Sequence, residues 1–365
     1  MLGFLTSYRR YIPWFYWPSF ESSATTVSEE EAKGARKVDD QPSHAFELGK
    51  KHLVLEDDEY DEGCIISHGP KEQSCPSELP IDLTLSLFQQ SIYPVAYGWQ
   101  SDIWKCTLKQ DSHSHEVAVK SIRSHDLSAE DLRKRNEQLR PALKLRARLK
   151  HDNILPLLGI ASGFGRFTAL VYPWVENGTL TSHLQRNGEQ LSFRDRLELL
   201  SDAAAALCYL HSCSIVHGQF TASNIFVSAS GKGQISGFGF TNIILGFLEK
   251  SSSLNGIVRW AAPEILATHD DGLAPTEQSD VYSLGSVMLQ VCSGEVPYAD
   301  LRNKVQVLHA LTKGVTPSRP VTPLVNDRMW DFIQRCWSTQ EAKRPSAEEA
   351  LNFIREEISL LCPIL

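Results

Sequence analysis

The sequence predicts an α+β protein in which a small sheet lobe with one main helix precedes a larger, mostly helical lobe. Between about residues 90 and 171, short apolar runs of strand length alternate with turns. Beyond Asn177-Gly178 the apolar residues recur with helical spacing instead. The composition agrees with this class, because 42% of the 365 residues are hydrophobic and 22% are charged, as is usual for globular domains.

The strand-like runs of the first lobe are residues 92–95, 103–108, 116–122 and 167–171. One basic stretch between them, residues 133–150, has helical character and predicts the single main helix of this lobe. Its many lysines and arginines form either a docking patch or a solvated helix face, and we favour the solvated face.

The helices of the second lobe have clear signals. Phe193, Leu197, Leu200 and Leu207 fall on one helix face, and Ser192 is placed as the N-cap. Further helices are expected over residues 281–291, 330–337 and 347–360. At roughly 150 residues per domain, the chain is long enough for both lobes and ample core.

Residues 1–80 predict an acidic, mostly flexible leader. Residues 21–80 carry 15 acids and 6 bases, whereas residues 81–365 carry 29 and 28, so the folded part is nearly neutral. This balance argues against nucleic acid as the main partner. Residues 8–20 combine arginines with aromatic side chains, and we expect them to pack on the domain or on a partner. Contact with a membrane surface is the alternative that the sequence leaves open.

The eight cysteines contain no CxxC pair and no cluster with the spacing of a zinc site. This usage fits reduced thiols with structural roles. We therefore expect an intracellular (cytoplasmic) protein.

Over residues 85–360, ordered landmarks resemble the protein kinase fold, in particular the tyrosine-kinase-like group. The segments that carry the resemblance are Val117-Ala118-Val119-Lys120, residues 171–180, Ile215-Val216-His217-Gly218-Gln219 with Asn224, residues 235–239, Ala262-Pro263-Glu264, residues 279–285 and Arg344-Pro345. The resemblance implies a two-lobed fold, with a small antiparallel-sheet N-lobe at about 85–171, a hinge at 172–178 and a helical C-lobe at about 179–360.

The resemblance also implies a nucleotide cleft lined by Ala96, Gly98, Ile103, Ala118, Lys120, Tyr172 as gatekeeper, Trp174, Val175, Asn224 and Phe226. Of the glycines of the family's phosphate loop, only the middle one remains, Gly98, so this loop is either a weakened phosphate cradle or an ordinary hairpin. Lys120 is either the phosphate-binding lysine or a strand lysine with its head in water. Phe226 is expected to narrow the cleft.

Three acidic groups that phosphoryl transfer needs are absent from their expected positions. Ala142 stands where the family places the glutamate that pairs with the lysine, Gln219 where it places the catalytic aspartate, and Gly237 where it places the metal-binding aspartate. Arg146 falls at an apolar position of the family, although a shift of one residue would put Leu145 there. Asn224 is retained, either as a metal ligand or as a turn-stabilising asparagine.

Residues that the family uses to hold the fold remain. Glu264 and Arg344 are expected to form a buried ion pair, and Asp280 is expected to brace the catalytic-loop backbone. The resemblance also gives His217 and Phe238 structural positions in these loops. The residues that support the fold are therefore kept, whereas the residues that catalysis needs are lost.

This contrast predicts a pseudokinase that acts as a protein-binding or signalling-regulatory module, with a protein partner such as an active kinase. No cofactor is required, ATP binding is weak at most, and magnesium is not expected because the charged ligand at 237 is missing. The alternative is an atypical active kinase that uses Lys120 and Asn224 with a distant acid such as Asp102. The apolar run at residues 243–248 is either a packed helix or a partner surface.

Overall fold

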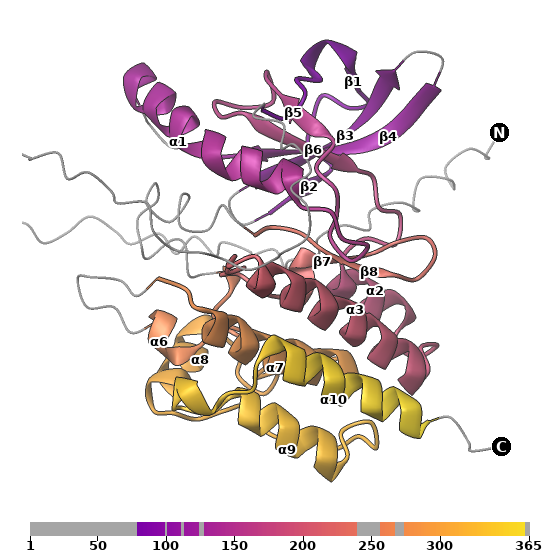
Figure 1. The fold of residues 1–365 in the computed structure, drawn as a ribbon, viewed down its shortest axis with the longest axis vertical. Coiled ribbons are helices and arrows are strands. Elements are labelled where there is room, and N and C mark those ends of the chain that lie inside the picture. Colours follow the sequence, from indigo (N-terminus) through magenta and orange to yellow (C-terminus); the bar gives the residue numbers. More distant parts are fainter. Residues whose placement is uncertain are drawn as a thin grey trace, which may run out of the picture. The chain divides into compact units, whose positions relative to one another are not determined.

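The computed structural model describes residues 79–98, 101–110, 113–123, 128–238, 256–266 and 274–361. These ranges contain the two expected lobes, so the α+β, two-lobed fold is confirmed (Figure 1). The leader up to residue 78, its aromatic segment at 8–20 and the apolar run at 243–248 lie outside the described residues.

A six-stranded antiparallel sheet forms the described small lobe, in the order β1-β3-β4-β6-β5, with β2 paired to β3. Its strands are β1 (Leu87–Gln89), β2 (Ala96–Tyr97), β3 (Ser101–Gln110), β4 (His113–Ile122), β5 (Gly159–Ala161) and β6 (Ala169–Pro173). β3 and β4 pair along their whole length, from Ser101 opposite Ile122 to Gln110 opposite His113. The sheet packs on both faces, because Val117 and Val119 of β4 belong to one apolar cluster whereas Ile122 belongs to a second one.

The predicted strand at residues 92–95 is wrong. Ile92 and Tyr93 are exposed, and the Tyr93 amide donates a hydrogen bond to the Ser91 side chain at 3.1 Å, as in a turn. The edge of the sheet is formed by β1 instead, which pairs with β3. The folded domain also begins before residue 85, because Leu83 is buried and its amide bonds to Ile160 in β5.

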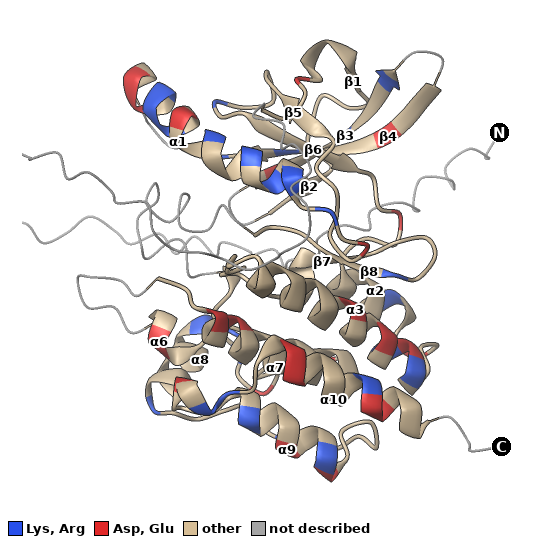
Figure 2. Ribbon diagram, viewed as in Figure 1, with Lys and Arg blue, Asp and Glu red and all other residues tan. Residues whose placement is uncertain are grey.

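The single main helix of the small lobe is α1 (Ala129–Arg148), which begins at the N-cap Ser128. Leu139 and Leu143 point inward and join the apolar cluster of the sheet. Figure 1 shows α1 beside the small-lobe sheet. Lysines and arginines recur along this helix in Figure 2. Two of them, Arg133 and Lys134, pair with acids one turn away in the same helix and remain exposed, which fits the solvated-face interpretation.

The large lobe contains α2 (Leu180–Asn187), α3 (Phe193–Ser212), α6 (Pro263–Leu266), α7 (Glu277–Ser293), α8 (Lys304–Thr312), α9 (Asp327–Cys336) and α10 (Ala347–Leu360). Two short 3-10 turns, η2 (Ala222–Asn224) and η4 (Glu341–Lys343), belong to this lobe, whereas η1 (Thr84–Ser86) precedes β1 in the small lobe. The hairpin of β7 (Ile225–Val227) and β8 (Gly233–Ile235) faces the small lobe. Ser192 caps α3 as expected, in a capping box with Asp195.

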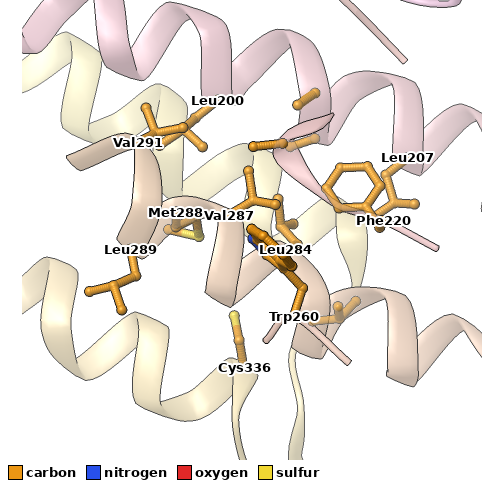
Figure 3. Packing of buried hydrophobic residues seen from close by; sticks show 14 of the residues in the cluster. Leu200, Leu207, Phe220, Trp260, Leu284, Val287, Met288, Leu289, Val291 and Cys336 are labelled. Carbon is orange, nitrogen blue, oxygen red and sulfur yellow. The ribbon is translucent and has the colours of Figure 1, made fainter. Parts of the chain in front are cut away.

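The core of the large lobe is built around α7, which is buried along most of its length. Leu284, Val287 and Met288 of this helix pack with Leu200 and Leu207 of α3 (Figure 3). The packed helices α7 and α3 therefore support the loops of the candidate site.

In the described part of the chain, no helix combines the length and the apolar character needed to cross a membrane.

Candidate functional site

The loop after α3 is hydrogen-bonded to Asp280, which lies in the first turn of α7. Its carboxylate accepts hydrogen bonds from the backbone amides of His217 at 2.7 Å and Gly218 at 2.8 Å, and it lies 3.0 Å from Nε2 of His211. Asp280 is 1% exposed, so these contacts are shielded from water. The structure thus places Asp280 against the loop backbone that the sequence assigned to it.

His217 is fully buried and its hydrogen bonds define its tautomer. The amide of Gln219 donates to Nδ1 at 3.2 Å, so Nδ1 is an acceptor, and Nε2 donates to the Ser236 carbonyl at 3.0 Å. Burial lowers the pKa of His217 to about 4, against the opposing attraction of Asp280. The imidazole is therefore neutral at pH 7, and it links the loop at 217–219 to the strand end before Gly237.

Glu264 and Arg344 form the ion pair expected from the sequence. The guanidinium contacts both carboxylate oxygens, at 2.6 and 3.0 Å, and the Arg344 side chain is fully buried. Arg344 also donates to the carbonyls of Gln278 and Ser338. The pair therefore ties α6 to the start of α7 and to the loop before α10.

Gln219 and Asn224 interact through the loop backbone. Asn224 Nδ2 donates to the Gln219 carbonyl at 2.8 Å, which is the turn-stabilising contact that one interpretation of Asn224 expected. The hydrogen bonds of Gln219 in the structure use its backbone amide and carbonyl. Its side chain carries an amide where a general base would need a group that takes up a proton near neutral pH.

Gly237 has a backbone conformation and surroundings that disfavour any side chain. Its φ is +91°, in the region that L-residues rarely adopt. A Cβ at this position would lie 2.9 Å from Oδ1 and 3.0 Å from Cγ of Asn224. A side chain at the position of the missing metal-binding carboxylate would therefore require the Asn224 side chain to shift.

Ala142 and Arg146 both lie on the face of α1 that meets the sheet. Ala142 packs against the small-lobe cluster, and Arg146 is 4% exposed. Leu145 is 41% exposed, so the alternative alignment that put Leu145 inward is wrong. Spacing along the helix explains this result, because residues 139, 143 and 146 share one face.

The Arg146 guanidinium crosses to the large lobe. Its Nη1 donates to the Phe238 carbonyl at 2.8 Å, and its Nη2 lies 3.4 Å from the Ser236 hydroxyl. Its Cζ lies 4.1 Å from the ring centre of Phe238 and 5.2 Å from that of Tyr172. Arg146 thus joins α1, β6 and the segment after β8.

Lys120 lies on β4 opposite Ile103 and Leu170 of the neighbouring strands. Burial of the ammonium, assisted by the nearby charge of Arg146, lowers the pKa of Lys120 to about 8. By accessible surface Lys120 is half-buried, so its side chain is partly shielded from water. No carboxylate of a described residue forms a salt bridge with it.

Arg123 closes the hairpin that β2 and β3 form. This residue follows β4, and it donates to the Asp102 carboxylate at 2.7 Å and to the Gly98 carbonyl at 2.8 Å. The Gly98 amide donates to the Ser101 carbonyl at 2.6 Å. Asp102, the acid that the alternative mechanism required, is thus engaged at the hairpin.

Arg123 was missed from the sequence, although the pairing of β3 and β4 gives a signal. Ser101 lies opposite Ile122 in that register, so Arg123, the residue that follows β4, emerges beside the hairpin.

The apolar residues of the expected cleft do come together. Ala96, Tyr172 and Val175 are buried in one cluster, and Ile103 and Phe226 pack against it. Phe226 belongs to β7 of the large lobe, so it reaches across to the small lobe as expected for a residue that narrows the cleft. Ala118 lies opposite Tyr172 in the sheet. Trp174 lies under the ammonium of Lys105, 4.7 Å from its ring centre.

The residues present do not fit a magnesium ion of the kind the fold family uses. Magnesium prefers charged oxygen ligands in octahedral geometry. Residues 203–238 contain neither aspartate nor glutamate, and the space beside Gly237 is taken by the Asn224 side chain. Among the described residues, no group of three histidine, cysteine or acidic side chains is arranged to hold a metal. Of the family's two metal-binding positions, 224 and 237, only Asn224 carries a side-chain oxygen, and it is uncharged.

Comparison with known proteins agrees with this geometry. The family model for the protein tyrosine and serine/threonine kinases matches residues 91–354, well over half of the chain. The chain therefore belongs to the protein kinase family.

Its relatives include serine/threonine kinases. The probable serine/threonine-protein kinase SIS8 of Arabidopsis thaliana is 30% identical over 248 residues, covering 67% of this chain and 23% of its own length. Serine/threonine-protein kinase CTR1 of the same organism is 30% identical over 256 residues, covering 69% and 30%. The dual specificity protein kinase shkD of Dictyostelium discoideum is 28% identical over 298 residues, covering 80% and 37%. The chain thus spans about a quarter to somewhat over a third of the length of these relatives.

Proposed function

We propose that this chain is a pseudokinase of the tyrosine-kinase-like group, which binds a protein partner, such as an active kinase, instead of transferring phosphate. The observation that carries the proposal is that Gly237, at the position of the metal-binding aspartate, carries no carboxylate and adopts a positive φ with the Asn224 amide packed beside it. Two further positions support it, because Ala142 and Gln219 supply no carboxylate either. General-base help alone is worth roughly 10² to 10⁴ in rate.

The scaffold supports a binding role. Asp280, Glu264 and Arg344 make contacts that hold the large lobe in the kinase arrangement, and a rigid scaffold can present a surface to a partner. The near-neutral charge of residues 81–365 favours a protein over nucleic acid. An intracellular location is part of the proposal, supported by the free thiols of Cys106, Cys292 and Cys336.

Nucleotide binding, in this proposal, is weak and independent of magnesium. The apolar cluster of Ala96, Tyr172 and Val175 and the lysine at 120 favour some affinity. The Gly98 amide and carbonyl, in contrast, are already bonded to Ser101 and Arg123. Without a charged ligand at 237, magnesium adds little.

The test is transfer of radiolabelled phosphate from ATP by the purified protein, to itself and to a general protein substrate. Wild type and Lys120→Ala should incorporate the same background label. Incorporation by wild type that Lys120→Ala abolishes would show the atypical active kinase instead.

A further inference from the structure

The helix α8, which lies beside α6 in the large lobe, presents apolar side chains to solvent (Figure 1). Its core contacts are made by Val307 and Leu311, which are buried. Four large apolar residues that are exposed lie on this helix and on the chain that follows it: Val305, Leu308, Val315 and Val321. Single apolar residues on a surface need no explanation, but several that gather at one element mark an interaction site.

The fold fixes this part of the surface. α8 begins with a capping box between Asn303 and Gln306. It ends in a Schellman motif, in which the Val315 amide donates to the Ala310 carbonyl at 2.9 Å. The Val315 carbonyl also accepts a hydrogen bond from the Tyr298 hydroxyl at 2.9 Å. The backbone that carries the exposed side chains is therefore ordered before a partner binds, and little ordering entropy opposes binding.

The chain around these apolar residues is basic. Residues 301–326 contain four lysines or arginines and no aspartate or glutamate. Arg319 is paired with Asp327 at 2.7 Å. Arg302, before the helix, and Lys313, after it, are exposed and form no salt bridge with a carboxylate of a described residue. The nine residues of α8, about 14 Å in length, thus lie between two positive charges.

We propose that this α8 patch, formed by Arg302, Val305, Leu308, Lys313 and Val315, binds a segment of a partner protein in which apolar side chains are flanked by aspartate or glutamate. The apolar side chains of the two proteins cover each other, and the acids of the partner meet the bases at both ends of α8. A basic partner segment is repelled by the same charges. The inference rests on the proposed function, and it names the chemistry of the partner.

The experiment is fluorescence anisotropy of the full-length protein with two labelled amphipathic helical peptides. One peptide is built of leucine, alanine and glutamate, and the other has lysine in place of every glutamate. The glutamate peptide should bind saturably, and at least tenfold more tightly than the lysine peptide. Leu308→Glu, and the double variant Arg302→Glu, Lys313→Glu, should each weaken binding of the glutamate peptide at least tenfold.

The matched controls change exposed residues elsewhere in the large lobe. Leu360→Glu places the same charge on another exposed leucine, and Lys343→Glu, Arg355→Glu reverses two other exposed bases. Both should keep the Kd for the glutamate peptide within about twofold of wild type. If Leu308→Glu does not fold, Val305→Glu replaces it with the same expectation, because Val305 is 75% exposed and Leu308 only 39%.

The inference would be overturned by no saturable binding of the glutamate peptide, by equal affinity for the two peptides, or by unchanged affinity in Leu308→Glu. An equal loss in Lys343→Glu, Arg355→Glu would show attraction by net charge alone and would also contradict it. Self-association that Leu308→Glu abolishes, measured by light scattering, would make the α8 patch an interface between copies of this chain instead. Failure of peptide binding without phosphate transfer ends this inference alone, whereas phosphate transfer by wild type ends the proposed function.

Discussion

Removal of Arg344 should destabilise the large lobe strongly while leaving the cleft residues in place. The Arg344→Ala substitution leaves the Glu264 carboxylate, 15% exposed, without the two charged hydrogen bonds at 2.6 and 3.0 Å, and it frees the carbonyls of Gln278 and Ser338. Breaking one side of a buried ion pair costs about 3 to 5 kcal/mol. Because domains of this kind are stable by about 5 to 15 kcal/mol, this loss is a large fraction of the total.

The assay is urea unfolding followed by tryptophan fluorescence, with Gln219→Ala as the control. Gln219 uses its backbone in its loop hydrogen bonds, so its truncation should change the free energy of unfolding by less than about 1 kcal/mol. The double variant Glu264→Gln, Arg344→Met should be less destabilised than Arg344→Ala, since no charge is left without its partner. An Arg344→Ala protein that unfolds at the wild-type urea concentration would refute the buried-pair account.

Three further substitutions test the site. Gly237→Asp should lower the free energy of unfolding by about 1 to 3 kcal/mol through backbone strain. The loss should exceed that of Gly231→Asp, because Gly231 has a similar φ of +82° but open surroundings. Equal losses in urea unfolding would contradict crowding of position 237 by Asn224. The stability that neutral His217 gives should be lost as pH falls from 6.5 through 4, by up to roughly 3 kcal/mol, because only the unfolded state takes up the proton in that window. The difference between Tm–pH curves of wild type and His217→Gln measures this loss, and parallel curves would exclude it. Arg123→Ala should loosen the pairing of β2 with β3 and speed amide exchange of Gly98 and Ile103 by more than tenfold. Unchanged protection of these amides would show that Arg123 does not close the hairpin.

Local signals predicted the large-lobe helices well, because these helices are fixed by their own sequences. Ser192 and Asp195 form a capping box within one turn, and the helix predicted at 347–360 has the same bounds in the structure. The strand predicted at 92–95 failed for the opposite reason. Strand character is realised only where a partner strand is available, and β1 takes the place next to β3.

The sequence predicted which acidic residues the candidate site lacks, but not which side chains lie in their place. The missing acids at 142, 219 and 237 follow from the resemblance to the kinase motifs and their spacing. The direction of the Arg146 side chain cannot, since its contacts lie on residues 236 and 238, some 90 positions away in the chain. The contact between Asn224 and the space beside Gly237 likewise depends on tertiary packing.

The central claim is that the cleft has lost phosphoryl transfer through its backbone and packing as well as through three side chains. The most direct measurement is kinase activity of the triple variant Ala142→Glu, Gln219→Asp, Gly237→Asp, with magnesium and radiolabelled ATP. The account predicts that this variant remains inactive or nearly so, because the hairpin closed by Arg123, the cation at Arg146 and the strained position 237 all persist. Robust activity of the folded triple variant would show that only the acids were lost, and would contradict the account.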